Sequence, residues 1–209
     1  MAWPRGALAL HLVFGLAAAA VLAWLGPPRL GLAILALVAT YNLALPAWAL
    51  LAGHRDWLRA WLFVLPVSLL QTLPDAVLVN ALHSLSFPDL GAPSLLGVPA
   101  YMALMWVIPL LWIAMARTAW QALLITALVF ASAEWLAAPL QLWIAAGVNT
   151  VHGAALYVLP PELLLGLCTW FACQRVGHRG PLPRLGTAAA ISLIYTGALL
   201  WSWLLIERF

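Results

Sequence analysis

Three carboxylates lie inside strongly apolar stretches of this chain: Asp75, Glu134 and Glu162. The sequence has only six acidic residues among 209, and it has no lysine. An ionised side chain at bilayer depth costs roughly 2.5–3.5 kcal/mol on insertion scales, so such residues are expected to face a cavity or a bundle interior. Acids in apolar surroundings are candidates for proton transfer, and we take all three as candidate catalytic residues.

The composition predicts the class of protein that surrounds these acids. Hydrophobic residues make up 66% of the chain and charged residues 7%, with a mean hydropathy of +1.04. A helix needs about 20 apolar residues to cross roughly 30 Å of hydrocarbon. We therefore expect an all-α, polytopic membrane bundle, with residues 1–209 forming a single transmembrane domain of seven helices. The expected spans are about 6–25, 30–52, 60–82, 97–116, 118–146, 152–174 and 185–206, and Pro139 should end the regular helix of the fifth.

The arginines orient the expected bundle. All nine basic residues are arginines. With seven spans, only Arg29 and Arg208 fall on the side opposite the N-terminus. The positive-inside rule then predicts a cytoplasmic N-terminus and an integral protein of a bacterial inner (plasma) membrane. Topology explains the net charge of +3, so membrane lipids are the expected surroundings and no nucleic-acid partner is expected. The seven arginines on the N-terminal side are Arg5, Arg55, Arg59, Arg117, Arg175, Arg179 and Arg184.

The same spans place the three acids at similar depths. At 1.5 Å per residue, Asp75 lies about 22 Å and Glu134 about 24 Å from the inner boundary. Glu162 lies about 15 Å below the outer surface. Three separate helices thus predict one shared site in the middle-to-outer part of the membrane. Proline directly precedes both Asp75 and Glu162, and a proline kink beside an acid opens space and frees polar backbone.

Aromatic and polar residues near this depth are candidates for holding a substrate. Gln71 lies four residues before Asp75 and so shares its helix face. Indole faces stabilise a cation by up to about 2 kcal/mol or more when water is excluded. The polar members could instead form interhelical hydrogen bonds, which contribute about 0.6 kcal/mol each on average. The candidate substrate-binding residues are Trp106, Trp135, Trp143, Tyr157, Gln71, Asn42 and His152.

These residue types suit acid-initiated alkene chemistry. A carboxyl in an apolar site remains protonated at neutral pH because its ionised form would lose hydration, and it can then donate its proton. The resulting carbocation would be held by aromatic faces and a remaining carboxylate. Loss of a neighbouring proton completes a cyclisation or isomerisation, whereas capture of water completes a hydration. No cofactor is required, no histidine spacing predicts a metal site, and the absence of lysine excludes a retinal Schiff base.

Two stretches carry a family resemblance. Leu90-Gly91-Ala92-Pro93-Ser94-Leu95-Leu96-Gly97-Val98-Pro99, followed by Trp106, resembles the loop-then-helix pattern of membrane carotenoid hydratases. Leu159-Pro160-Pro161-Glu162-Leu163-Leu164 is similar to the Pro-x-Glu-Glu signature of the heterodimer-type carotenoid (lycopene) cyclases, with Leu163 in place of the second glutamate. The resemblance implies an isoprenoid-modifying membrane enzyme in which Glu162 corresponds to the first cyclase glutamate.

We therefore expect a cofactor-independent terpenoid or carotenoid cyclase or hydratase, of the lyase or isomerase class, that acts on a hydrophobic isoprenoid or lipid-like substrate. Two alternatives use the same features. A small proton-coupled transporter also needs embedded acids and kinked helices, and a non-catalytic subunit of a membrane complex needs only the bundle. The sequence leaves open the substrate, the product, the oligomeric state and which carboxylate is the proton donor.

Overall fold

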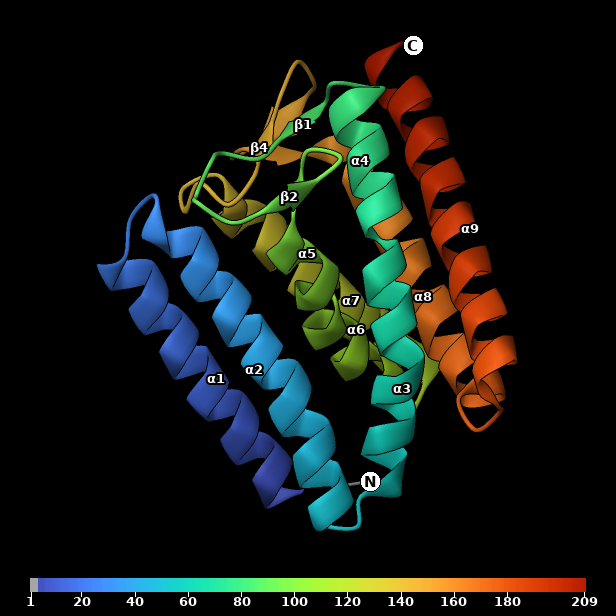
Figure 1. The fold of residues 1–209 in the computed structure, drawn as a ribbon. Helices are drawn as coiled ribbons and strands as arrows, with labels where there is room; N and C mark the ends of the chain where they lie inside the picture. Colours follow the sequence, from blue (N-terminus) through green and yellow to red (C-terminus); the bar gives the residue numbers. More distant parts are fainter. Residues whose placement is uncertain (1–3) are drawn as a thin grey trace.

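The computed structural model describes residues 4–209 as an elongated helical bundle, with the N-terminus at one end and the C-terminus at the other (Figure 1). Two helices near the N-terminus, α1 (Arg5–Trp24) and α2 (Arg29–Leu51), form a hairpin. The remaining long helices are α7 (Ala119–Ala137), α8 (Leu159–Val176) and α9 (Pro181–Glu207). Two further rods are each broken once, into α3 (Arg55–Leu70) with α4 (Thr72–Asn80), and α5 (Ala100–Met105) with α6 (Val107–Ala114).

The all-α class is confirmed, and the helices suit a membrane. Within residues 4–209, six helical segments are long and apolar enough to cross one, counting Arg55–Asn80 as a single rod. The segment Ala100–Ala114 is apolar but shorter. Large apolar side chains such as Leu16 on α1, Leu128 on α7 and Leu193 on α9 are exposed on the outside of the bundle. Extended apolar surface of this kind marks contact with a membrane.

Side chains of neighbouring helices donate hydrogen bonds to backbone carbonyls beside both helix breaks. Pro74 has no N–H to bond the carbonyl of Leu70, four residues earlier. That carbonyl instead accepts a hydrogen bond from Ser192 Oγ of α9 at 3.0 Å. At the second break, the carbonyl of Leu104 accepts a hydrogen bond from Asn42 Nδ2 at 3.1 Å. Irregular backbone at membrane depth is tolerated where such bonds replace the helical ones.

A small cap covers the end of the bundle near the C-terminus. It consists of short antiparallel strand pairs: β1 (Leu85–Ser86) with β4 (Ile144–Ala145), β2 (Ser94–Leu95) with β3 (Val98–Pro99), and β5 (Thr150–Val151) with β6 (Ala154–Ala155). Residues 138–146, expected to extend the fifth span, belong to this cap, because α7 ends at Ala137 just before Pro139. Asn149 fastens the cap to the end of α9, since its backbone N and Nδ2 each donate to Glu207 Oε2 at 2.9 Å.

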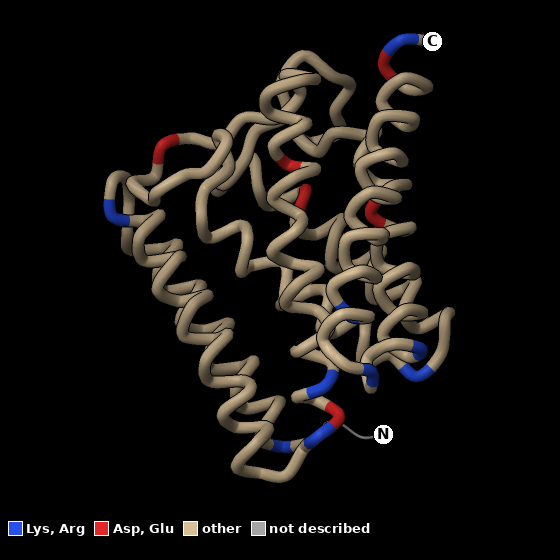
Figure 2. The backbone as a smooth tube through the Cα atoms, turned by 45° about the vertical axis from the view of Figure 1, so that its right-hand side comes forward, with Lys and Arg blue, Asp and Glu red and all other residues tan. Residues whose placement is uncertain are grey.

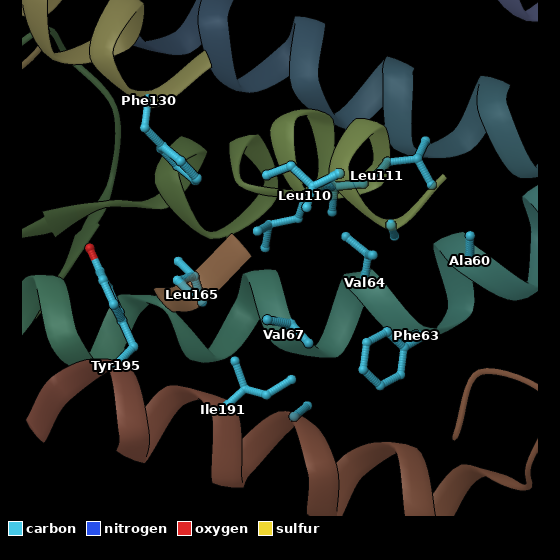
Figure 3. Close-up of a cluster of buried hydrophobic side chains, with 14 of the residues drawn as sticks. Ala60, Phe63, Val64, Val67, Leu110, Leu111, Phe130, Leu165, Ile191 and Tyr195 are labelled. Atoms are coloured by element: carbon cyan, nitrogen blue, oxygen red, sulfur yellow. The ribbon is translucent and has the colours of Figure 1, made fainter. Parts of the chain in front are cut away.

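The main hydrophobic core lies where α3, α6, α8 and α9 meet (Figure 3). Its centre combines Phe63 and Val67 of α3 with Leu110 of α6, Leu165 of α8 and Ile191 of α9, all buried. On one side of this core, α7 and α8 approach closely where Gly166 faces Thr126. This packing fixes the three rods that carry the acids of the candidate site.

The close approach at Gly166 should be intolerant of a methyl group. A Cβ at this position would collide with Thr126, whose Oγ1 is held by donation to the carbonyl of Ala122 at 2.6 Å. Gly166→Ala is therefore expected to destabilise the protein by about 1–3 kcal/mol through overpacking. Gly186→Ala on α9 is the matched control, because a Cβ there meets no atom within 4 Å. Thermal unfolding in detergent measures both; equal midpoints would contradict this account of the helix contact.

Candidate functional site

A cavity of about 330 Å³ lies beneath the cap and is lined mainly by apolar side chains. Its lining includes all three carboxylates singled out in the sequence: Asp75 from α4, Glu134 from α7 and Glu162 from α8. Volumes of roughly 300–1,000 Å³ are typical of pockets that bind small molecules. Three acids that are distant in the sequence thus share one mostly apolar space.

Local sequence explains how each acid reaches the cavity. Asp75 lies in the first turn of α4, directly after the break at Gln71. Glu162 lies in the first turn of α8, behind two prolines, which fit there because that turn needs no intrahelical N–H donors. Glu134 lies in the last turn of α7, just ahead of Pro139. All three therefore project from positions beside a helix end or break.

The three carboxylates differ in their hydrogen bonds. Asp75, only 4% exposed, accepts a long bond from Trp106 Nε1 to its Oδ2 at 3.4 Å. Glu134 Oε1 accepts from Trp143 Nε1 at 3.1 Å. Glu162 is 3% exposed, and its buried Oε2 has no hydrogen-bond partner among residues 4–209. Two acids are thus restrained by an indole N–H, whereas Glu162 keeps one oxygen free.

Aromatic rings from three parts of the chain line the cavity. The ring of Trp106 lies 5.3 Å from that of Phe130 and 6.3 Å from that of Tyr195, centroid to centroid. Phe130 and Tyr195 project into the bundle from α7 and α9 (Figure 3). Their π-faces can stabilise a cation more strongly where water is excluded. The acids and the rings therefore face the same space.

Of the candidate substrate-binding residues, Trp106, Trp143 and Tyr157 line the cavity, whereas Trp135 and His152 do not. Trp135 is 62% exposed on the outside of α7, one residue after Glu134 and so turned away from the cavity. Its ring packs 5.8 Å from the exposed ring of His152 in the cap. These two residues belong to the outer surface of the bundle.

Gln71 and Asn42 are buried, yet neither lines the cavity. Gln71 Nε2 donates to the carbonyl of Val67 at 3.2 Å, so the amide supports the break between α3 and α4. Asn42 bonds the carbonyl of Leu104 and accepts from Trp61 Nε1 at 3.1 Å. Asn42 thus serves the interhelical hydrogen bonding that the sequence left open as an alternative role, whereas the bond of Gln71 stays within its own helical rod.

Sequence reasoning missed most of the apolar lining of the cavity, and it also missed Phe130, Tyr195 and Ser84. Tyr195 is a single tyrosine in an apolar helix, and the sequence does not show which other helix its side chain faces. Ser84 lies in a loop and meets Tyr157 only because the cap folds over the bundle. Within residues 4–209, the His, Cys, Asp and Glu side chains form no group suited to holding a metal ion.

The hydrogen bond between Ser84 Oγ and Tyr157 OH, 2.7 Å long and buried, closes the cavity on the cap side. Ser84→Ala and Tyr157→Phe should each destabilise the protein by about 1 kcal/mol, because each leaves a buried partner unsatisfied. Because the two substitutions remove the same hydrogen bond, the double variant should lose no more stability than either single variant. Ser86→Ala, at an exposed neighbouring serine, is the control. Additive losses in thermal unfolding would show that the two hydroxyls act separately.

Comparison with known proteins gives one match. Residues 72–206 match the model of a family described as "Domain of unknown function (DUF6989)". The matched part covers more than half of the chain and includes Asp75, Glu134, Glu162 and Tyr195. No curated protein gives a significant match, and no solved structure does so either.

Proposed function

We propose that this chain, which belongs to the family described as a domain of unknown function (DUF6989), is an integral-membrane enzyme that modifies isoprenoids by protonating an alkene. The product would be a cyclised, isomerised or hydrated terpenoid or carotenoid. The observation that carries the proposal is the shared apolar cavity, which combines two buried carboxyls, Asp75 and Glu162, and the partly buried carboxyl of Glu134 with a cluster of aromatic rings. This combination supplies an acid, a base and cation stabilisation in a place shielded from water.

Glu162 is the proposed proton donor. Its free Oε2 is buried and belongs to a cavity-lining side chain, a position that suits a neutral carboxyl whose proton is available to a ligand. In the proposed step, the π electrons of the alkene form a new C–H bond with this proton. Glu162 becomes a carboxylate, and the neighbouring carbon of the substrate becomes a cation.

Asp75 and Glu134 are the proposed partners of that cation. Their indole bonds hold each carboxyl at the cavity wall, where negative charge stabilises a developing cation. One of them accepts the proton that leaves a neighbouring carbon when a cyclisation or isomerisation ends in a new double bond. In a hydration, water adds to the cation and its surplus proton passes to a carboxylate. In either case the protons balance without a cofactor.

Both stretches that resemble carotenoid hydratases and cyclases lead to residues of this cavity, although residues 90–99 themselves do not line it. The stretch Leu90–Pro99 forms the β2–β3 pair and leads into α5, which ends beside Trp106 and its bond to Asp75. The stretch around Pro161 opens α8 and carries Glu162. This convergence supports the carotenoid or terpenoid assignment, while Leu163 departs from the cyclase pair of glutamates.

We also propose seven spans with a cytoplasmic N-terminus in a bacterial inner membrane. The apolar segment Ala100–Ala114, fourth in chain order, completes the seven spans together with the six longer segments. Because the number of spans is odd, the chain termini lie on opposite sides of the membrane, and in Figure 1 they lie at opposite ends of the bundle. In Figure 2 arginine gathers mainly at the end where the chain begins. The positive-inside rule assigns such an end to the cytoplasm.

Reporter fusions test this topology. A reporter in the turn between α8 and α9, at residues 177–180, is expected to be cytoplasmic, and one after Phe209 is expected to be outside. A third fusion in the turn between α1 and α2, at residues 25–28, should agree with the one after Phe209. Cytoplasmic signals from both of the first two fusions would refute the seven-span arrangement.

The catalytic roles are tested by amide substitutions, once turnover of an isoprenoid alkene is detected. Glu162→Gln keeps the size of the side chain but removes the transferable proton. It should lower kcat by about 10²–10⁴-fold, the range of general acid catalysis, while substrate still binds. Asp75→Asn and Glu134→Gln, measured in the same assay, separate an acid that works in the reaction from one that only packs. Near-normal turnover of the Glu162→Gln variant would mean that Glu162 is not the proton donor.

A small proton-coupled transporter is the second candidate. The breaks in the α3–α4 and α5–α6 rods lie close to the acids, and broken helices near the membrane midplane are typical of transporter binding sites. Vesicle assays separate the two functions. A transporter moves an unchanged substrate with a proton across the bilayer, whereas the enzyme leaves a chemically altered isoprenoid.

A further inference from the structure

The cavity has one sealed wall and one partly exposed wall. The sealed wall comes from α4, the 3₁₀ turn η1 (Leu156–Val158), α8 and α9, and its lining side chains, including Leu78, Tyr157 and Tyr195, are buried. The opposite wall comes from α1, α5, α6 and α7. Two of its partly exposed lining residues are Pro109 and Glu134. We call the six other ones on these helices, all apolar, the lateral portal: Leu22, Met105, Ile108, Val129, Ala133 and Leu136.

The helices on the two sides of the lateral portal are not packed tightly together. The main contacts of α1 are with α2, whereas those of α7 are with α6 and α8. Figure 1 shows the α1–α2 hairpin at one edge of the bundle, with α7 set behind α5. Leu136 at the portal remains 55% exposed although it lines the cavity. The cavity therefore reaches the side of the bundle between α1 and α7.

The cap closes the cavity in the other direction. Leu85 and Ala145 of the β1–β4 pair pack onto the main core, and Phe87 and Trp143 pack onto a second core cluster under the cap. The α7 residues of the portal pack onto neither cluster. The outer faces of the two flanking helices carry exposed leucines, including Leu16 of α1 and Leu128 of α7. Beside the portal the surface thus suits hydrocarbon and not water.

We infer that the cavity is loaded sideways from the bilayer through the lateral portal, by an uncharged, chain-like hydrocarbon whose unsaturated end reaches the acids. The six portal residues are apolar, Glu134 is the one partly exposed acid on the same wall, and within residues 4–209 no arginine or histidine lines the cavity. A diphosphate or carboxylate head group would find three carboxyls and no cation there. At about 330 Å³ the cavity is near the small end of ligand pockets, so the rest of a long chain lies in the portal and the lipid. The chemistry at the buried end rests on the proposed function, but the route does not.

Photolabelling tests the route without requiring turnover. The probe is a long isoprenoid hydrocarbon with a diazirine at one end, premixed into phosphatidylcholine vesicles that contain the protein. A short, water-soluble diazirine alcohol added from outside is the second probe. The lipid-borne probe should label peptides that contain cavity residues 102–109 and 155–162, and the water-soluble one should not. Labelling by the water-soluble probe alone, or by neither probe, would overturn the inference.

Portal variants sharpen the test. Ala133→Phe fills the portal and should lower cavity labelling by at least about tenfold. Ala131→Phe on the same helix is the matched control, because Ala131 is exposed but does not line the cavity, and its labelling should stay within about twofold of wild type. Leu136→Ala widens the portal and should raise labelling, which keeps the test decisive if Ala133→Phe does not fold. Equal labelling of wild type and Leu136→Ala would contradict a portal at this place.

The outcomes separate the route from the proposed function. Portal-dependent labelling in a protein that converts no isoprenoid alkene would support the lateral route and reject the enzyme. Turnover of an alkene that is unaffected by Ala133→Phe, in a protein that folds as well as Ala131→Phe, would support the enzyme and reject the route.

Discussion

The structure depends on how polar groups are satisfied inside an apolar bundle. A buried polar group without a partner costs roughly 1–3 kcal/mol, and a charged one costs more. The carbonyl of Leu70, freed by Pro74, is bonded by Ser192, and the carbonyl of Leu104 is bonded by Asn42. Because these bonds stabilise the helix breaks, the chain can open a cavity at mid-bundle without exposing bare backbone to hydrocarbon.

The breaks place acids and rings around the same space. The break at Gln71 is followed by the turn that carries Asp75, and the break between α5 and α6 brings Trp106 within hydrogen-bonding range of it. The two prolines at the start of α8 are followed by Glu162 in the first turn of that helix. Of the three acids, only Glu162 keeps a buried oxygen without a partner in the described part of the chain. This difference in hydrogen bonding is the physical basis for giving the acids different roles.

The family match covers nearly all of the cavity lining and leaves out the part that comes from α1. Residues 72–206 contain all three acids, the aromatic rings beside them and all the strands of the cap, whereas α1, α2 and α3 precede the matched region. The chemistry-bearing wall is therefore part of the family domain. The α1–α2 hairpin adds Leu22 to the portal and packs mainly against α5 and α3, so it bears on how the cavity is reached more than on what it can do.

The sequence by itself determined the all-α class, the approximate helix positions and the three acids, because hydrophobic length and the scarcity of charge are local properties of the chain. Matching depths also indicated that Asp75, Glu134 and Glu162 could share a site. Only the tertiary structure decided which neighbours join them. It brought Phe130 and Tyr195 to the cavity and turned Trp135 outward, because helix rotation is set by packing between helices and an apolar stretch has no polar face to reveal it. It likewise assigned Asn42 to the carbonyl of Leu104, which comes within reach only when the rods are assembled. Gln71 bonds the carbonyl of Val67 one turn earlier on its own rod.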